Sequence, residues 1–543
     1  MSDLPSATKV AIIGSGPAGL ALAIELGYRG VPCVILERSV RAGYAPRAKT
    51  THSRTREHMR RWGIADKLAA ASPFGVEYPS HVNFVTRLGG HLLHRFEHAL
   101  DCKAERNEEF SEHGQWIPQY KLEKVLIDHA LSLPGVEICY GQTFTGYTAL
   151  DGGVSVQLYD SATSRDWELS AEYLVGADGA GSAVRDAIGA KMEGTYGLSR
   201  NLNVIFRAPE LAAKHPHGDG IMYWQINPDF PSLIGPMDTG DLWYFMPTGI
   251  DAANAPSLEA AADMIRAATG IDTEIEVLSS DEWVASKLLA DRFRTDRTFL
   301  IGDAGHLHPP FGGFGMLLGV GDAVDIGWKL AAVLQGWGGT ALLDSFEVER
   351  RQTAQFVLDA AEANHTILAN QLILPHIEED TPEGVAARQE AAEMVRKHKH
   401  GEFYARGVVL GYCYCNSPAI IDDGTQKDWK RSIDYTPSAT PGCIAPHCWL
   451  ADDSSLYDHF GQGFTLLITD KVDAQEIAKA RKTAEDVGMP LTVFAPKDGR
   501  LAKLYGAPLV LIRPDQHVAW RGEVVPTVDV FEQLIGRRSS LKA

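Results

Sequence analysis

A glycine-rich turn near the start of the chain has the residue types and spacing of a phosphate-binding turn. Gly14, Gly16 and Gly19 form the pattern G-x-G-x-x-G between an apolar run and a helical pattern over 20–28. In such turns the first glycine permits a tight bend, the second lets a pyrophosphate approach the backbone, and the third lets helix and strand pack closely. The N–H groups at the start of the helix, beside Pro17 and Ala18, would face the phosphates.

A second apolar run over 33–36 ends in an acidic residue with the spacing of a ribose-binding group. Glu37 stands 23 positions after Gly14 and is followed by Arg38. An acid about 20 residues beyond the first glycine accepts hydrogen bonds from ribose hydroxyls in dinucleotide-binding folds. We therefore predict a dinucleotide site rather than a purely structural glycine turn. This segment alone leaves FAD and NAD(P) as alternatives.

Two further strand ends carry acidic turns. The run over 173–177 leads into Asp178 and Gly179, and the run over 298–301 leads into Gly302 and Asp303. The second turn continues into a stretch rich in proline and glycine, followed by a long helical pattern. Its members include Pro309, Pro310, Gly313, Gly315, Met316 and Leu317.

Metal and thiol chemistry are weaker interpretations of this sequence. His306 and His308 alternate, as residues on one face of a strand do, but no acidic or cysteine partner is adjacent, so we expect no metal site. The seven cysteines have no disulfide or zinc spacing and are expected to be free thiols. Four residues separate Cys443 from Cys448, whereas a C-x-x-C dithiol needs two intervening residues.

Length and charge limit the class of protein. A chain of 543 residues is long enough for about three domains, and 45% hydrophobic with 22% charged residues is typical of globular proteins. The net charge of −19 argues against nucleic-acid or anionic-membrane partners. Because no signal-like start or long apolar run is visible, we expect a cytoplasmic protein with no membrane contact.

With three matching blocks in order, the sequence resembles the FAD-dependent aromatic hydroxylases, a flavoprotein monooxygenase superfamily that includes p-hydroxybenzoate hydroxylase and phenol hydroxylase. In that family the Asp178-Gly179 turn is implicated in FAD and NAD(P)H binding, and the aspartate matching Asp303 bonds the ribityl chain. The helix start at 315–317 would stabilise negative charge on the reduced flavin. Arg47 and Gln119 match positions that contact the flavin and its ribityl chain.

Two positions depart from the family pattern. The family commonly has glutamine where this chain has Phe314, and asparagine where it has Leu317. The flavin edge is therefore expected to be more apolar here. Backbone contacts could survive both changes.

The middle of the chain is expected to form a sheet. Short alternating runs over 202–206, 220–226, 233–237 and 241–246 predict strands with one covered face. The resemblance implies that this sheet covers the flavin ring and lines a substrate pocket. Its candidate lining residues are Tyr223, Tyr244, Gln225 and Trp243, together with Pro309.

The resemblance extends over nearly the whole chain and gives the expected domain division. The fold class is α/β, with a Rossmann-like FAD-binding domain of the p-hydroxybenzoate hydroxylase type over 1–190 and 291–400. An inserted β-sheet substrate domain spans 191–290, and linker loops span 401–445. A thioredoxin-like domain over 446–543, without a C-x-x-C pair, is expected to be structural or to form a homodimer contact.

The activity that the resemblance implies is hydroxylation of a phenolic ring, ortho or para to its hydroxyl. NAD(P)H would bind transiently and reduce FAD, and O2 would react through a flavin C4a-hydroperoxide; the cofactor carries this chemistry while the protein supplies binding and excludes water. Two alternatives stay open. One is a flavin-dependent dehydrogenase or oxidase of the same fold, and the other is a non-catalytic flavin-binding assembly protein.

Overall fold

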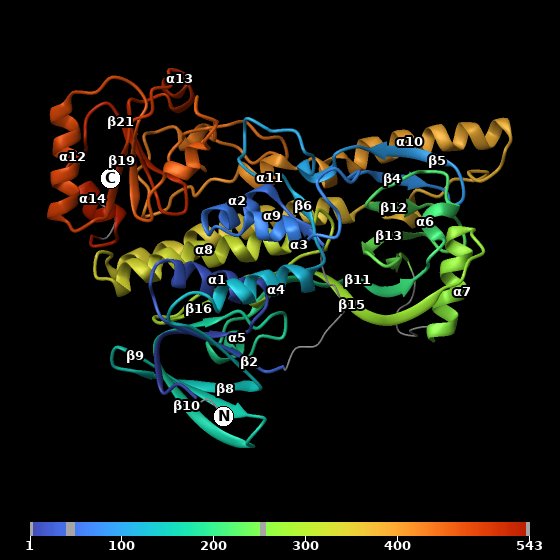
Figure 1. Ribbon diagram of the computed structural model, residues 1–543, viewed down its shortest axis with the longest axis horizontal. Coiled ribbons are helices and arrows are strands. Elements are labelled where there is room, and N and C mark those ends of the chain that lie inside the picture. Colours follow the sequence, from blue (N-terminus) through green and yellow to red (C-terminus); the bar gives the residue numbers. More distant parts are fainter. Residues whose placement is uncertain (1–3, 40–48, 250–256, 539–543) are drawn as a thin grey trace.

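The computed structural model describes residues 4–39, 49–249 and 257–538. These residues form three large sheets with helices packed around and between them (Figure 1). The chain beyond residue 460, in dark orange and red, lies at one end of the molecule, and the green central sheet lies at the other. None of the described helices is long and apolar enough to cross a membrane.

The first sheet has seven strands, and the strand that precedes the glycine-rich turn pairs in parallel with both of its neighbours. Strands β7, β2, β1, β10 and β16 run parallel, and β9 and β8 extend the sheet in antiparallel fashion beside the first half of β10. This is the arrangement that the strand, turn and helix pattern predicted. The strands are β1 (Ala7–Ile13), β2 (Cys33–Glu37), β7 (Val136–Tyr140), β8 (Gln142–Leu150), β9 (Gly153–Asp160), β10 (Arg165–Gly176) and β16 (Thr298–Leu300).

The second sheet has eight strands in the order β17-β15-β11-β14-β13-β12-β4-β5. The four runs predicted in the middle of the chain are strands of this sheet. It also recruits β4, β5 and β17 from outside 191–290, because parallel pairing of β4 with β12 joins the two segments. Its strands are β4 (Val82–Val85), β5 (Leu92–Phe96), β11 (Met192–Arg207), β12 (Met222–Gln225), β13 (Ser232–Asp238), β14 (Leu242–Pro247), β15 (Glu276–Ala290) and β17 (His306–Leu307).

The third sheet confirms the expected thioredoxin-like topology near the end of the chain. A parallel pair joined by a helix is followed by an antiparallel hairpin and a last helix, in the order β19-β18-β20-β21. Its strands are β18 (Phe464–Ile468), β19 (Leu491–Phe494), β20 (Leu509–Ile512) and β21 (Val518–Gly522). A two-stranded ladder of β3 (Thr50–Thr51) and β6 (Gln115–Trp116) lies apart from the three sheets.

The helices cover the sheets and connect them. Helix α8 is mostly apolar and most of its residues are buried, as expected of a helix surrounded by protein. The chain beyond α8 forms two long helices, α9 and α10, with a break between them. The longer helices are α1 (Pro17–Tyr28), α2 (Ser53–Arg61), α4 (Gln119–Ala130), α7 (Leu258–Thr269), α8 (Gly315–Leu334), α9 (Asp344–His365), α10 (Pro382–Phe403) and α12 (Ala474–Asp486). The shorter ones are α3 (Ala65–Ala71), α5 (Ala183–Ala187), α6 (Leu211–Lys214), α11 (Arg406–Leu410), α13 (Arg500–Tyr505) and α14 (Val528–Leu534).

Candidate active site

The strand-end turns singled out in the sequence meet at one edge of the first sheet. The Gly14 N–H donates to Leu36 O, the Ala177 N–H to Ile13 O, and the Ile301 N–H to Gly176 O. These bonds place the ends of β1, β2, β10 and β16 side by side. The carboxyl edge of such a sheet, where parallel strands end, is where open α/β folds bind nucleotides.

Helix α1, the Gly302 turn and helix α8 approach one another so closely that only small residues fit between them. A Cβ on Gly302 would lie 3.1 Å from the Ala18 Cβ, and a Cβ on Gly319 would lie 3.3 Å from the same atom. A Cβ on Gly19 would lie 2.1 Å from the Gly14 carbonyl oxygen, so the third glycine is required for packing. Helix α1, which follows the glycine-rich turn, therefore contacts both the Gly302 turn and helix α8.

Gly16 differs from these packed glycines. A Cβ built there would meet no atom of the described residues within 4 Å. Its φ of −71° and ψ of 177° are extended values that any residue adopts, so the backbone does not demand glycine. The glycine instead leaves open space at the start of α1, where the helix N–H groups can receive a phosphate. This is the space that a dinucleotide pyrophosphate needs.

The acidic residue at the end of β2 faces the glycine-rich turn. The Ser15 N–H and hydroxyl both donate to Glu37 Oε2, at 2.9 and 3.0 Å. Arg38, the next residue, is exposed. Gln119 begins α4 and donates through Nε2 to Glu123 Oε1 at 2.8 Å. Arg47 lies outside the described residues.

The Asp178 turn is held by the start of α5. Asp178 accepts hydrogen bonds from the Ser182 hydroxyl at 2.5 Å and from the Val184 N–H at 3.2 Å. Gly179 has a φ of 81°, a left-handed value that favours glycine. Arg185 then donates to the Ala304 carbonyl oxygen at 3.2 Å, which ties this turn to the one that contains the exposed Asp303.

Helix α8 begins without a side-chain cap among the described residues. Its first helical backbone bond is the Leu318 N–H to Phe314 O, so the N–H groups of Gly315, Met316 and Leu317 are the orphan donors of the first turn. Together with the helix dipole they form a positive region suited to an anion or a polarised carbonyl. Pro310 is exposed just before this turn, and Pro309 is buried.

A histidine pair supports the loop before α8. His308 donates from Nδ1 to Pro309 O at 2.7 Å, and its Nε2 would lie 3.2 Å from a Cβ on Gly315. Burial lowers the pKa of His308. His52 bonds Gly312 O through Nε2 at 2.9 Å and stacks on Phe314. The aromatic residue that departs from the family pattern thus has a packing partner.

His306 is part of a buried ion network with Asp322 and Arg350. Its Nε2 lies 2.7 Å from Asp322 Oδ2, the oxygen that also accepts the Gly302 N–H at 3.0 Å. Arg350 donates from Nε to the other oxygen of Asp322 at 2.7 Å and from a guanidinium nitrogen to Leu318 O at 3.1 Å. Although burial alone would raise it, Arg350 and His306 lower the pKa of Asp322. The network fixes the Gly302 turn against α8.

A buried lysine and tyrosine face each other on the inner side of the second sheet. Lys49 donates from Nζ to Ile221 O at 2.7 Å and to Pro236 O at 3.1 Å, and its Nζ lies 4.1 Å from the Tyr244 ring centroid. Burial holds the pKa of Lys49 well below its usual range and raises that of Tyr244. The Tyr244 hydroxyl is therefore neutral near pH 7. The Tyr244 hydroxyl is buried without a hydrogen-bond partner among the described residues.

The structure separates the two tyrosines proposed for the pocket. Tyr244 packs with Trp116, Phe311 and Trp224, whereas Tyr223 packs with Trp243 and the residues under α7 on the opposite face. The Tyr223 hydroxyl donates to Gly218 O at 2.6 Å, so its bonding capacity is used inside its own loop. The expectation that both tyrosines line one pocket is corrected here. Trp243 lies on the Tyr223 side, and Gln225 bonds within the sheet to the Ser232 hydroxyl.

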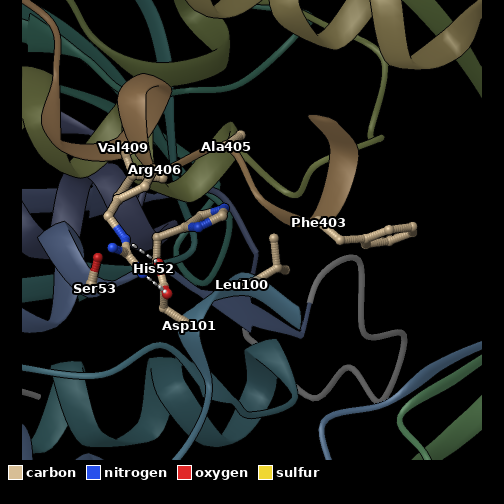
Figure 2. Close-up of a pocket in the computed structure, with 8 residues that line it drawn as sticks. All are labelled: His52, Ser53, Leu100, Asp101, Phe403, Ala405, Arg406 and Val409. Atoms are coloured by element: carbon tan, nitrogen blue, oxygen red, sulfur yellow. Dashed lines mark hydrogen bonds and ion pairs between the residues drawn. The ribbon is translucent and has the colours of Figure 1, made fainter. Parts of the chain in front are cut away.

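A small cavity opens between the start of α2 and the end of α10 (Figure 2). Its empty volume is about 240 Å³, including the part open to solvent. Arg406 reaches Asp101 with two hydrogen bonds, at 3.0 and 2.5 Å, beside His52. Leu100 and Asp101 have φ values of 60° and 56°, which residues other than glycine rarely adopt, so the ion pair holds a strained segment. Its lining residues are His52, Ser53, Leu100, Asp101, Phe403, Ala405, Arg406 and Val409.

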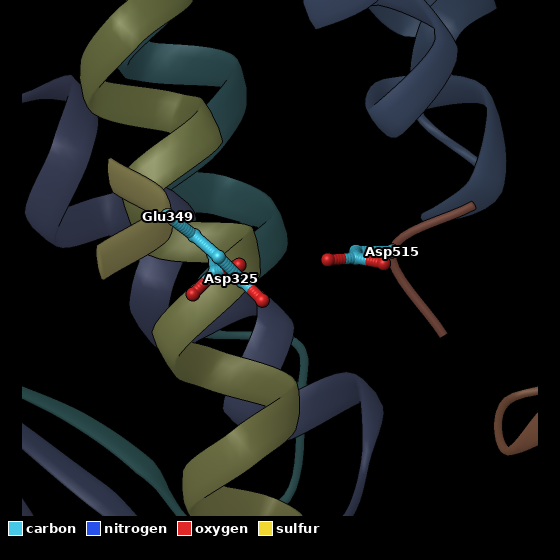
Figure 3. Close-up of side chains that lie close together, drawn as sticks. All are labelled: Asp325, Glu349 and Asp515. Atoms are coloured by element: carbon cyan, nitrogen blue, oxygen red, sulfur yellow. The ribbon is translucent and has the colours of Figure 1, made fainter. Parts of the chain in front are cut away.

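A second buried acidic cluster on α8 and α9 is occupied by protein cations. Asp325, Glu349 and Asp515 lie close enough to share an ion, and Figure 3 shows Asp515 facing the two residues of α8 and α9. Lys329 Nζ lies 2.6 Å from both Asp325 and Glu349, and Arg513 bonds all three carboxylates. The cluster is thus a buried salt-bridge network that joins the carboxyl-terminal region to α8 and α9.

Several residues of this site were not predicted. Lys49, His52 and Trp116 reach it through the short ladder of β3 and β6, whose two-residue strands leave no periodic pattern to detect. Lys49 follows Arg47 in a basic stretch that is typical of an exposed loop. Only the fold brings it to the carbonyls of two sheet strands. No hydrophobic pattern around Lys49 in the sequence indicates that this lysine is buried.

Comparison with known proteins identifies relatives over the full length of the chain. The family described as FAD binding domain matches residues 7–361, and the one described as aromatic-ring hydroxylase, C-terminal, matches residues 438–537. FAD-dependent monooxygenase apdD of Emericella nidulans is 31% identical, covering 98% of this chain and 90% of that protein. The 2,4-dichlorophenol 6-monooxygenase of Delftia acidovorans is 30% identical, covering 95% and 94%.

A solved structure shares the whole architecture. The rebeccamycin biosynthetic enzyme RebC, with reduced flavin, superimposes with a TM-score of 0.90 at 32% identity, covering 99% of this chain and 100% of that one. The fold is therefore that of the p-hydroxybenzoate hydroxylase type with an additional carboxyl-terminal domain.

Proposed function

Because the chain belongs to the family of FAD-dependent aromatic-ring hydroxylases, we propose that its substrate is a phenolic compound hydroxylated ortho or para to its hydroxyl. The chain itself is an FAD-dependent monooxygenase. The convergence of the strand-end turns next to the uncapped start of α8 supports the flavin site, and the observation that carries the phenolic substrate is the buried Tyr244 hydroxyl, which has no partner among the described residues. Relatives that act on 2,4-dichlorophenol and in rebeccamycin biosynthesis are of comparable identity, so the size of the ring system is not fixed by them.

The residues present fit FAD. Open space at Gly16 and the start of α1 suits the pyrophosphate, and Glu37 at the end of β2 suits the adenosine ribose. We assign Asp303, which is exposed beside these turns, to the ribityl chain, and Asp178, Gly179, Gln119 and Arg38 to the edges of the same site. When bound, FAD would take electrons from NAD(P)H and activate O2 for transfer of one oxygen atom.

The protein would stabilise charge at the start of α8. The N–H groups of Gly315, Met316 and Leu317 point out of an uncapped helix, and we assign them to the flavin carbonyl that becomes negative on reduction. The apolar side chains of Phe314 and Leu317 are buried beside them. They help to exclude water, which would otherwise promote loss of the activated oxygen.

We assign the Tyr244 hydroxyl to the substrate hydroxyl. It is buried, neutral and without a partner among the described residues, so it can donate a hydrogen bond to a phenolic oxygen or accept one from it. Lys49 donates to two sheet carbonyls and lies over the Tyr244 ring, which fixes the orientation of that ring. Lys49 is thus a positioning residue.

A panel of phenols tests the proposal. Single-ring phenols, phenolic acids and polycyclic phenols would each be added to FAD-loaded protein with NADH or NADPH, and cofactor oxidation would be compared with hydroxylated product by chromatography. We expect at least one phenol to stimulate oxidation with matching product, while the same ring lacking its hydroxyl does not. Stimulated oxidation that yields only hydrogen peroxide for every phenol would contradict a phenolic substrate and favour an oxidase. The homodimer and the cytoplasmic location remain predictions.

A further inference from the structure

Three cysteines, Cys413, Cys415 and Cys443, come together beside α9, although their sequence spacing does not indicate a disulfide. Cys413 and Cys443 face each other across an antiparallel bridge, and the Tyr414 N–H donates to Gly442 O at 2.9 Å. That bond pattern makes Cys413 and Cys443 a non-hydrogen-bonded pair, in which the Cα atoms are about 4.5 Å apart and side chains are closest. A disulfide spans Cα distances of about 4.4 to 6.8 Å, so the backbone is already suited to one.

The third thiol lies on the other side of Cys413. Cys415 follows Cys413 by two residues, the neighbouring Cys415 and Cys443 thiols raise the pKa of Cys413, and all three thiols are free. The hydrogen bond from Cys413, with the Arg431 guanidinium as a further cause, lowers the pKa of Cys415. Cys415 is half-buried, while the other two are buried. Cys415 is thus the thiol of the three that is both reachable and favoured as a thiolate.

A small cavity lies against the Cys413 side of this cluster. Cys413 lines it together with Gln352, Thr353, Phe356, Tyr412, Trp429 and Arg431. Its empty volume is about 180 Å³, including the part open to solvent. Arg431, at the wall of this cavity, is the second group that lowers the pKa of Cys415, after Cys413.

We propose that Cys415, Cys413 and Cys443 form a peroxide-oxidised thiol relay that ends in a reversible Cys413–Cys443 disulfide. Hydrogen peroxide, the product that a flavin monooxygenase releases when reduction is not coupled to hydroxylation, is the oxidant. The relay does not depend on which ring the enzyme hydroxylates.

The steps balance as follows in atoms and electrons. The Cys415 thiolate attacks one peroxide oxygen, the O–O bond breaks, and after proton uptake a sulfenic acid and one water are formed. The Cys413 thiol then displaces the sulfenic hydroxyl, giving a Cys413–Cys415 disulfide and a second water. The Cys443 thiolate attacks Cys413 Sγ, forms the cross-strand disulfide and releases Cys415 as a thiolate. In total two thiols and one peroxide become one disulfide and two waters.

The position of the cluster links it to the flavin helix. Tyr414 lies between Cys413 and Cys415 and bonds the Arg350 guanidinium at 3.0 Å through its hydroxyl. Arg350 in turn bonds Asp322 and the Leu318 carbonyl of α8. A disulfide at Cys413 therefore constrains the segment that supports Arg350, and we expect it to change the visible spectrum or the affinity of bound FAD.

Peptide mapping of the peroxide-treated holoenzyme tests the relay. FAD-loaded protein would be treated with a slight excess of hydrogen peroxide, quenched with an alkylating agent and digested without reductant. We expect two fewer titratable thiols per chain, a cross-linked peptide containing Cys413 and Cys443, and full recovery with dithiothreitol. An unchanged number of thiols would overturn the proposal. So would oxidation spread over all seven cysteines without this cross-link.

Single substitutions separate the roles. Cys415→Ser should slow formation of the cross-link without preventing it at long times, and Cys443→Ser should stop the reaction at the Cys413–Cys415 disulfide. Cys448→Ser is the matched control, because Cys448 is a buried free thiol outside the cluster and should leave rate and product unchanged. Equal rates in wild-type and Cys415→Ser protein would remove Cys415 from the relay.

Discussion

The buried salt-bridge network between the carboxyl-terminal region and helices α8 and α9 allows a quantitative prediction. Arg513 is fully buried and bonds Glu349, Asp325 and Asp515. Replacing it with methionine keeps most of the apolar volume but removes one of the two cations that pair with the three carboxylates. Lys329 is then the only cation of the network, and at least one buried carboxylate charge is left without a partner.

Removing one member of a buried ion pair costs about 3 to 5 kcal/mol, because the remaining charge keeps its desolvation penalty. We therefore expect Arg513→Met to lower the free energy of unfolding by about that amount. Arg207→Met is the control, because Arg207 pairs with Glu276 at 2.7 Å but both side chains are about half exposed. Exposed pairs contribute about 0 to 1 kcal/mol.

Urea-induced unfolding followed by circular dichroism measures both variants, and limited proteolysis reports whether the carboxyl-terminal domain undocks first. Adding Glu349→Gln to Arg513→Met should recover part of the loss, since it removes a stranded charge. Equal destabilisation by Arg513→Met and Arg207→Met would refute the claim that this network holds the domains together. The claim would also be refuted if adding Glu349→Gln to Arg513→Met lowered the free energy of unfolding further instead of recovering part of the loss.

Three further predictions concern the nucleotide turn, the sheet and the buried histidine. Gly16→Val should weaken FAD binding by more than about tenfold, about 1.4 kcal/mol, with little change in unfolding, because its side chain would enter open space that we assign to the pyrophosphate. Gly75→Val is the matched control, since a Cβ there also meets nothing within 4 Å; unchanged flavin affinity in Gly16→Val would contradict the assignment. Tyr244→Phe should lower kcat/KM by about tenfold without loss of stability, because its hydroxyl has no partner among the described residues, whereas Tyr223→Phe should cost about 1 kcal/mol of stability and leave kinetics unchanged. The reverse pattern would exchange the roles of the two faces. Burial lowers the pKa of His52 to about 4. Below about pH 6.5 the unfolded state therefore binds a proton at His52 that the folded state does not bind until about pH 4. The free energy of unfolding should fall as the pH drops from about 6.5 to about 4. The contribution is at most about 3 kcal/mol, and His52→Gln should flatten that part of the stability profile; an identical profile would show that His52 does not titrate there.

The nucleotide-binding half of the site could be predicted because its signals are local. A strand, a tight turn and a helix start follow one another in the chain at Gly14, and the same is true before Asp178 and Asp303. Local alternation also located β11, β12, β13 and β14 of the second sheet. The turns then meet because parallel neighbouring strands end at one edge, which the βαβ pattern already implies.

The substrate side could not be predicted in the same way because it depends on register between distant strands. Alternation showed that Tyr223 and Tyr244 each lie on one face of a strand, but not which face the rest of the protein covers. The pairing of Tyr223 with Ile234, and of Ile234 with Phe245, is what puts Tyr223 opposite to Tyr244. Likewise, the parallel pairing of β4 with β12 is a long-range contact that no sequence pattern records.

The origin of the added oxygen tests the central claim most directly. A phenol that stimulates NAD(P)H oxidation would be turned over by FAD-loaded protein under heavy-isotope O2 in ordinary water, and the product would be analysed by mass spectrometry. The account predicts one heavy oxygen atom in each product molecule and none when the label is in the water instead. Product oxygen derived from water, or oxidation of the phenol with no oxygen added, would contradict it.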